Sequence, residues 1–403
     1  MDISPKIKRD FIILVLMGGF NFLGFNLVQP ILPGFARSLG AQNIEIGLIT
    51  AGFVISSIIS RIYFAPMADS RGRKKTLIVG LIIYGISPFL YIFASTPFAL
   101  MAIRLFHGIG MGASTVSITA MLTDIIPHNK RGTMLGISMS ARNVASAAAP
   151  AIAGSFVLFA GFTSTIALSA IPAIGALMLY FFVSETLPKD KRWKRSLGNQ
   201  MSLMRDLVRS RRVMIPSLGI LSQTITYGAI VSFLPLFVAQ RLSLPVEEAT
   251  FIVGISFAGH ATAAAISRIF LGRAIDRYGR KPAPILSLFS LFGIILYLSQ
   301  ISSSVEVYIA MTLYGLAMSS ISPALTAMLV DSVKAEERAS ALSVYMSSFE
   351  LGIGVGAILF GFLSTLLGYS SMFIIAAFAP LLGAVFLLVF AKETLVRDQP
   401  SNQ

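Results

Sequence analysis

Long apolar stretches alternate with short polar turns along the whole chain. Twelve of these stretches hold about 20 residues, the length that an α-helix needs to cross roughly 30 Å of hydrocarbon. The predicted spans are residues 11–33, 45–66, 77–96, 100–123, 134–159, 162–183, 213–238, 250–271, 283–302, 306–330, 341–367 and 370–390. The pattern therefore predicts an all-α membrane protein with twelve transmembrane helices.

The polar turn after the second span returns after the eighth. Five pairs of residues recur at a constant offset of 207 positions, namely Asp69 and Asp276, Gly72 and Gly279, Arg73 and Arg280, Asp124 and Asp331, and Arg131 and Arg338. One offset shared by separate turns indicates a duplication rather than a chance similarity of one basic loop. The chain is expected to form two six-helix bundles, residues 1–186 and 213–403, joined by a basic cytoplasmic linker at residues 187–212.

The composition also favours a bilayer. Hydrophobic residues make up 55% of the chain and charged residues 12%, whereas soluble domains carry about 25% charged residues. The net charge of +14 would suggest nucleic acid in a soluble protein. Here only Arg37 and Arg241 lie in loops on one side of the predicted spans, and most other basic residues lie on the side of the termini. This asymmetry follows the positive-inside rule and predicts a multi-pass protein of the cell (inner) membrane, with both termini cytoplasmic, contact with membrane lipid and no nucleic-acid partner.

Several chemistries are disfavoured by what the chain lacks. It has no cysteine, so disulfides and thiolate metal sites are excluded. Three scattered histidines and isolated carboxylates supply neither a metal cluster nor a paired acid and base. The sequence contains no G-x4-G-K-[ST] phosphate loop, which argues against ATP hydrolysis. Neither a metal site nor an enzyme activity is expected.

Polar residues inside the spans mark candidate sites, because such groups are costly in lipid. The candidate substrate-binding residues are Asn21, Asn26, Gln29, Arg104, His107, Met111, Arg142, Asn143, Gln223, Tyr227, His260 and Glu350. Glu350 is the only carboxylate far from a predicted membrane surface, so it is expected to be functional, either by taking up a proton or by meeting a substrate charge. The alternative is a structural Glu–Arg or Glu–His pair that locks the bundles. Arg142 is expected to face the cavity and to meet Glu350, a substrate carboxylate or a chloride ion.

Prolines and glycines shape two of the predicted helices. Pro30 and Pro33 either break the first helix beside a cavity or only terminate it. Gly108 and Gly112 are four residues apart in the fourth span, a spacing that permits close helix approach in lipid. Arg104, His107 and Met111 follow helical spacing on a neighbouring face and are expected to form a polar patch.

Four sequence motifs, one of them loosely matched, are similar to those of one protein family. The turn at 272–281 carries the complete pattern G-x-x-x-D-R/K-x-G-R-R/K, whereas the earlier copy has Ala65 for the leading glycine and Ser70 for a basic residue. The first span matches L-G-x5-P-x-x-P, and the fourth matches R-x-x-Q-G-x-G with His107 in place of glutamine. The fifth-span pattern G-x3-G-P-x-x-G-G is matched loosely around Pro150, with alanines for glycines. On these residues the chain resembles the major facilitator superfamily, and within it the twelve-span drug:proton antiporters.

The resemblance implies the major facilitator fold, in which two pseudo-symmetric bundles enclose a central cavity and work by alternating access. It implies proton-coupled export of small organic molecules or drugs by a monomer, with the proton gradient as energy source and no cofactor. The proton-coupling candidates are Glu350, Asp69, His260 and His107. The alternative is an uncoupled or proton-coupled transporter of a sugar or another native metabolite.

The charged turns are expected to form a cytoplasmic gate. Its candidate residues are Asp69, Gly72, Arg73, Asp124, Arg131, Asp276, Arg277, Gly279, Arg280, Asp331 and Arg338. Asp69 is expected to face nearby arginines and the positive N-terminus of the following helix, and Asp124–Arg131 and Asp331–Arg338 pairs are expected to extend the network. Such contacts would latch the outward-open state, because inward opening separates them. The alternative is that these charges only end the spans and set the topology.

Overall fold

The computed structural model describes residues 4–127, 130–188, 205–334 and 337–394. All regular secondary structure within these residues is helical, which confirms the all-α prediction. The helices are α1 (Pro5–Val28), α2 (Leu32–Ser38), α3 (Asn43–Arg71), α4 (Arg73–Ile92), α5 (Pro97–Ile125), α6 (Arg131–Leu168), α7 (Ala170–Tyr180), α9 (Arg211–Leu242), α10 (Val246–Tyr278), α11 (Pro282–Leu298), α12 (Ser304–Met318), α13 (Ile321–Ser332) and α14 (Arg338–Phe390).

The helices make twelve passes through the predicted membrane. Nine helical stretches of the described chain are long and apolar enough to span, and α11 is a shorter apolar helix. Two of the nine stretches pass twice, because the backbone reverses at Gly161 in α6 and at Gly368 in α14. Both glycines have positive φ, 71° and 76°, a conformation that side chains with a Cβ rarely adopt. The number of passes therefore agrees with the apolar pattern.

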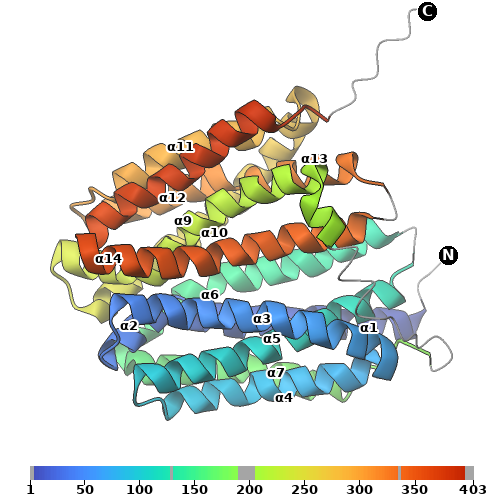
Figure 1. Cartoon of the computed structure of the whole chain (residues 1–403). Helices are drawn as coiled ribbons and strands as arrows, with labels where there is room; N and C mark the ends of the chain where they lie inside the picture. The colour runs from blue at the N-terminus through green and yellow to red at the C-terminus, as the bar shows by residue number, and fades with distance from the viewer. Residues whose placement is uncertain (1–3, 128–129, 189–204, 335–336, 395–403) are drawn as a thin grey trace, which may run out of the picture.

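The passes form two groups of nearly parallel helices. In Figure 1, α1, α3, α4, α5 and α7 lie in one group and α9, α11, α12 and α13 in the other, with α14 beside α3 at the boundary. The start of α1 and the end of α14 lie at the same end of the molecule, which we call the terminal face. The opposite end carries α2, and we call it the α2 face.

The 207-residue offset relates the backbones of the two groups. Gly72 and Gly279, which follow α3 and α10, both have φ of 113°. Gly161 and Gly368 also obey the offset and reverse α6 and α14 in the same way. The offset therefore pairs α3 with α10 and α6 with α14. The linker at 187–212 stays a prediction, since residues 189–204 lie outside the described part of the chain.

The first predicted span is broken near its end. α1 stops at Val28, and α2 begins at Leu32 after a turn that contains Pro30. Pro33 lies in the first turn of α2, where its missing N–H group has no helical partner to lose. The first of the two alternatives, a proline break within the span predicted at residues 11–33, is therefore confirmed.

Small residues allow α5 to pack closely against α3, as the spacing of the glycines in α5 predicts. A Cβ atom added to Gly112 would lie 2.8 Å from the Cβ of Ser60, and one added to Gly108 would overlap the carbonyl of Phe53. This contact confirms the close approach. It also turns the neighbouring face of α5, with Arg104, towards the interior of its own bundle.

Candidate functional site

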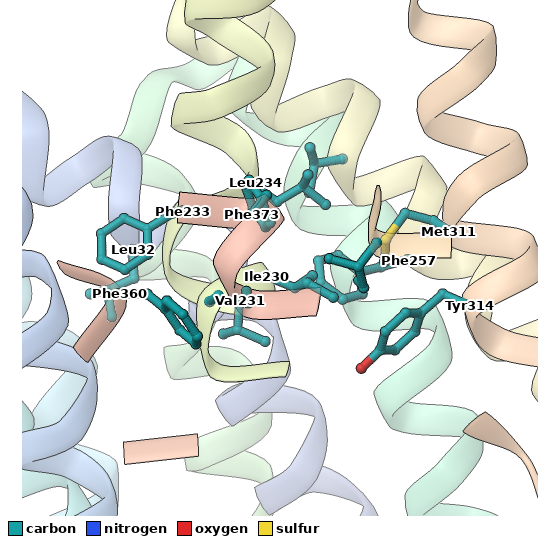
Figure 2. Close-up of a cluster of buried hydrophobic side chains, with 14 of the residues drawn as sticks. Leu32, Ile230, Val231, Phe233, Leu234, Phe257, Met311, Tyr314, Phe360 and Phe373 are labelled. Atoms are coloured by element: carbon teal, nitrogen blue, oxygen red, sulfur yellow. The ribbon is translucent and has the colours of Figure 1, made fainter. Parts of the chain in front are cut away.

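Apolar side chains close the space between the bundles at the α2 face. Figure 2 shows a cluster to which Leu32 of α2, Phe233 of α9 and Phe360 of α14 all belong. Each of these side chains is almost fully buried. Because α2 continues the first bundle and the other two helices belong to the second, the cluster seals this face between them.

A polar contact reinforces the same closure. The Nη2 atom of Arg37 in α2 donates to the hydroxyl of Tyr369 in α14 over 3.0 Å. The Tyr369 hydroxyl donates to Oδ1 of Asn43 at the start of α3 over 2.8 Å, and Arg37 also contacts Asn43. The three side chains therefore link both bundles.

Two helix pairs form the interface between the bundles, α3 with α14 and α6 with α10. Gly47 of α3 lies so near the carbonyl of Ala357 that a Cβ atom would overlap it. Gly254 of α10 lies in the same way against the carbonyl of Pro150. The two contacts correspond under the 207-residue offset, so the bundles meet through equivalent backbone contacts on the α2 side of the molecule.

A cavity of about 550 Å³ lies between α1, α6, α9 and α10. Val144 and Ile266 line it from opposite bundles and are 69% and 54% exposed. Ile266 lies 12 positions beyond Gly254, or about 18 Å along the helix towards the terminal face. The helices α6 and α10 therefore separate on this side of their backbone contact, and the cavity opens towards the terminal face.

The cavity gathers predicted residues from both halves. Five of them line it, namely Asn26, Gln29, Asn143, Tyr227 and His260. Asn26 Nδ2 donates to the Ser146 hydroxyl over 3.1 Å. Gln29 Oε1 and His260 Nδ1 are buried and have no hydrogen-bond partner among the described residues. Pro30 lines the cavity as well. The helix break therefore faces the cavity, as predicted by the alternative in which the prolines break the first helix beside a cavity.

Arg104 and His107 do not line this cavity. Both are 1% exposed inside the first bundle, where the guanidinium of Arg104 lies 4.3 Å from the ring centre of Phe53. His107 Nδ1 lies 3.0 Å from the hydroxyl of Tyr91. The expected polar patch exists, but the packing of α5 on α3 encloses it within one bundle.

Three further candidates are also enclosed within a bundle. Asn21 Nδ2 donates to the Ser114 hydroxyl over 3.0 Å, and Gln223 Nε2 donates to the Tyr314 hydroxyl over 3.0 Å. Met111 packs in a small buried cluster beside α4. None of the three is among the residues that line the cavity, so in this conformation they hold helices together within one bundle.

Arg142 lies against α1. Its guanidinium is 5.4 Å from the ring centre of Phe22, and a Cβ atom on Gly18 would come within 3.2 Å of its Nε. That Nε atom has no hydrogen-bond partner among the described residues. Arg142 was expected to face the cavity, but it is not among the residues that line it. Of the three anions considered for Arg142, Glu350 pairs instead with Arg61.

Glu350 forms an ion pair that joins the two bundles. Its Oε1 lies 2.6 Å from Nη2 of Arg61, and the side chains are 23% and 29% exposed. Arg61 also donates to the Ser57 hydroxyl over 3.2 Å. Arg61 belongs to α3 and Glu350 to α14, so the geometry matches the alternative of a Glu–Arg pair between bundles. Arg61 was not selected from the sequence as a partner, although its place inside a span was the available signal.

Arg268 was also missed by sequence reasoning, although it lines the cavity from α10. The repeat could have identified Arg268, since it is the equivalent of Arg61 at the 207-residue offset. An arginine inside a span is costly unless it meets an anion or water. Arg268 is exposed. It is the only formally charged side chain among the described residues that line the cavity.

The charged turn of the first half forms a compact network. Arg73 Nη1 contacts Oδ1 of Asp69, and Arg73 Nε lies 3.2 Å from Oδ2 of Asp124. The carboxylate of Glu185 accepts hydrogen bonds from the backbone N–H groups of Arg73 and Lys74, over 3.1 and 3.2 Å. Glu185, and not Asp69 as predicted, therefore faces the N-terminus of α4.

The turn of the second half repeats this arrangement. Arg280 Nε lies 2.9 Å from Oδ2 of Asp331, and Glu393 accepts from the backbone N–H groups of Arg280 and Lys281, over 2.9 and 3.0 Å. The similarity of the two chain segments that carry Glu185 and Glu393 is visible in the sequence, but their capping role required the structure.

Several of the ion pairs predicted for the cytoplasmic gate are replaced by others, and some gate residues are not described. Asp124 and Asp331 pair with Arg73 and Arg280. The expected partner of Asp331, Arg338, is exposed. The side chains of Arg131, Asp276 and Arg277 lie outside the described part of the chain. All the ion pairs described at these turns join groups of one bundle, as expected when the terminal face is open.

Comparison with known proteins assigns the family. The Major Facilitator Superfamily model matches residues 14–259 and 251–403. The chain is 26% identical over 396 residues to Multidrug resistance protein 2 of Bacillus subtilis, and the match covers 96% of each. It shares the fold of the nucleoside transporter NupG, with a TM-score of 0.78, 15% identity and coverage of 95% and 99%. For the xylose transporter XylE of E. coli, the TM-score is 0.74, the identity 15% and the coverage 98% and 100%. The chain therefore belongs to the Major Facilitator Superfamily.

Proposed function

We propose that this transporter exports small organic molecules in exchange for protons, across the cell membrane and by alternating access. The positive-inside asymmetry supports a cytoplasmic terminal face, and with that orientation the cavity between α6 and α10 is inward-open. Substrate would enter it from the cytoplasm. The relationship to a multidrug resistance protein supports export over uptake.

The observation that carries the proposal is the Arg61–Glu350 ion pair across the bundles. Alternating access moves α3 relative to α14, so the pair forms in one state and separates in the other. In the inward-open state Arg61 is the partner of this carboxylate. We propose that a proton from outside takes the place of Arg61 once the pair has separated, and that the return of Arg61 releases this proton to the cytoplasm.

The other proton-coupling candidates fit less well. His260 lines the cavity and could exchange protons with it. His107 is enclosed with Tyr91 inside the first bundle, and Asp69 is held by Arg73. We therefore assign the coupling proton to Glu350, and we assign the charged turns to the cytoplasmic gate that closes when the bundles rock.

Proteoliposomes test the proposal. Purified protein is reconstituted, a pH gradient is imposed, and transport is measured for two dyes with the same fused-ring body, anionic fluorescein and cationic rhodamine methyl ester. At least one dye should accumulate only while the gradient persists, and collapse of the gradient should abolish its accumulation. Dye accumulation or equilibration that does not depend on the pH gradient would contradict proton coupling.

The alternative is a transporter of a sugar or another native metabolite. Uncharged hydrogen-bonding groups on the cavity wall, among them Asn26, Gln29 and Asn143, favour it because such groups suit hydroxyl-rich substrates. The solved structures of a nucleoside and a xylose transporter share the fold. Gradient-independent equilibration of a labelled sugar, without transport of either dye, would support this alternative.

A further inference from the structure

The two interfaces between the bundles correspond under the 207-residue offset but differ in charge. At the α3–α14 interface Arg61 meets Glu350 at 2.6 Å. At the α6–α10 interface the equivalent of Arg61 is Arg268, and the equivalent of Glu350 is Asn143. The second interface has therefore kept the cation and has a neutral amide in place of the carboxylate.

The backbone geometry shows that these positions are structural equivalents. Gly47 contacts the carbonyl of Ala357 at one interface, and Gly254 contacts the carbonyl of Pro150 at the other. Both pairs obey the same offset as the charged positions. Arg268 and Asn143 thus occupy the places that the ion pair occupies at the first interface, and both line the 550 Å³ cavity.

The cation at the second interface lacks a protein counter-charge. Among the residues that the structure describes, Arg268 has no ion-pair partner, and no acidic side chain lines the cavity. Arg142 precedes Asn143 in α6, and its buried Nε has no described hydrogen-bond partner. Glu350, the one carboxylate found between the bundles among the described side chains, is already paired with Arg61. Arg268 therefore gives the cavity wall a positive charge that no described carboxylate on that wall balances.

We propose that the cavity recognises a small organic anion, whose carboxylate or sulfonate group lies between Arg268 and Asn143. The bound anion takes the place that Glu350 fills at the first interface. Guanidinium groups bind such oxyanions with two parallel hydrogen bonds, and the Asn143 amide supplies another donor. His260 lines the same cavity, and a neutral imidazole has one N–H group that can donate to a further oxygen.

The rest of the cavity suits the body of such a molecule. Tyr227, Val231 and Phe257 line the side opposite α6 and offer aromatic and aliphatic surface. The expected substrate is an amphiphilic organic anion with one acidic group. This assignment rests on the proposed transport function, because it names the substrate class of the same cavity.

Equilibrium binding without any gradient tests the charge preference apart from proton coupling. Protein in lipid nanodiscs is titrated with fluorescein and with rhodamine methyl ester, and fluorescence anisotropy is corrected with empty nanodiscs. The wild type should bind fluorescein at least about tenfold more tightly than the cation, and Arg268→Gln should remove that preference. The Arg268 variant should unfold at an equal or higher temperature, because it loses an unpaired cation, whereas a purely structural arginine would leave a less stable protein.

The decisive variant restores the missing carboxylate. Asn143→Glu should pair with Arg268 and weaken fluorescein binding at least about tenfold relative to Asn143→Gln, which has the same length and no charge. Arg211→Gln, at the exposed start of α9, controls for the loss of a positive charge elsewhere. Tighter binding of the cation, no fluorescein binding at millimolar concentration, or an unchanged preference in Arg268→Gln would overturn the proposal. Displacement of fluorescein by equimolar chloride would assign the site to an inorganic anion and would overturn it too.

Discussion

Arg37 Nη2 donates to the hydroxyl of Tyr369 over 3.0 Å and so connects α2 of the first bundle to α14 of the second. The bond lies at the α2 face, where Leu32 and Phe233 also close the molecule. Since an outward-open state must separate these groups, the contact contributes to the preference for the state with an open terminal face.

Tyr369→Phe removes this bond and the bond from the same hydroxyl to Asn43, and it should shift the population towards the outward-open state. Each hydrogen bond contributes about 1 kcal/mol, so their loss corresponds to roughly a five- to thirtyfold change in the equilibrium. The chain has no cysteine, so a single Ala147→Cys reporter in the cavity can be labelled by an impermeant maleimide added at the α2 face. Labelling should be several-fold faster in the Tyr369 variant. Tyr297→Phe, on a partly exposed tyrosine of α11, should label like the parent.

Gly254→Val should prevent full closure at the α6–α10 interface. A Cβ atom at this position would press on the carbonyl of Pro150, and backbone on both sides leaves little room to adjust. The Ala147→Cys reporter should then be labelled from the α2 face at least about tenfold faster. Gly136→Val is the matched control, because a Cβ atom there has nothing within 4 Å. Equal labelling in the two valine variants would show that the glycine contact does not control closure.

Glu185→Gln and Glu393→Gln should each lower the stability of the purified protein. Each carboxylate accepts two backbone N–H bonds at a helix N-terminus, of α4 and of α11. Loss of the negative charge there should cost about 1 kcal/mol. Thermal unfolding in detergent should show a lower midpoint for each variant and a further decrease for the double variant. Asp206→Asn, at an exposed position, should leave the midpoint unchanged.

The fold was predictable because it depends on local length and on repetition. Apolar runs of spanning length fix the number of passes, and one offset relates Gly72 to Gly279 and Gly161 to Gly368, where the backbone adopts the same positive φ. The helix ends were less predictable. α3 continues to Arg71, beyond the span predicted at residues 45–66, and Pro30 breaks α1 before the apolar run stops.

The site was predictable only in part, because polarity within a span does not show which face meets the cavity. Asn26 and His260 line it, whereas Arg104 and His107 share the same chemistry and lie inside one bundle. The direction of α5 depends on how its glycines pack on α3, which is a tertiary contact. The pairing of Glu350 likewise depends on the register of α3 against α14, and helical spacing within either span does not contain that information.

Glu350→Gln, which imitates the protonated carboxylate, should abolish dye accumulation driven by a pH gradient and leave equilibrium dye binding largely intact. Arg61→Gln should also uncouple transport, because Glu350 then lacks its ion-pair partner on the other bundle. If the two residues act as one unit, the double variant should lose no more than either single variant, and a double-mutant cycle should give a coupling energy of about 0.5–3 kcal/mol. The ion pair is partly exposed, so each single substitution should change the unfolding free energy by only about 1 kcal/mol. Gradient-driven accumulation with a normal pH dependence in Glu350→Gln would remove the coupling role from Glu350 and transfer it to His260, the remaining titratable candidate on the cavity wall.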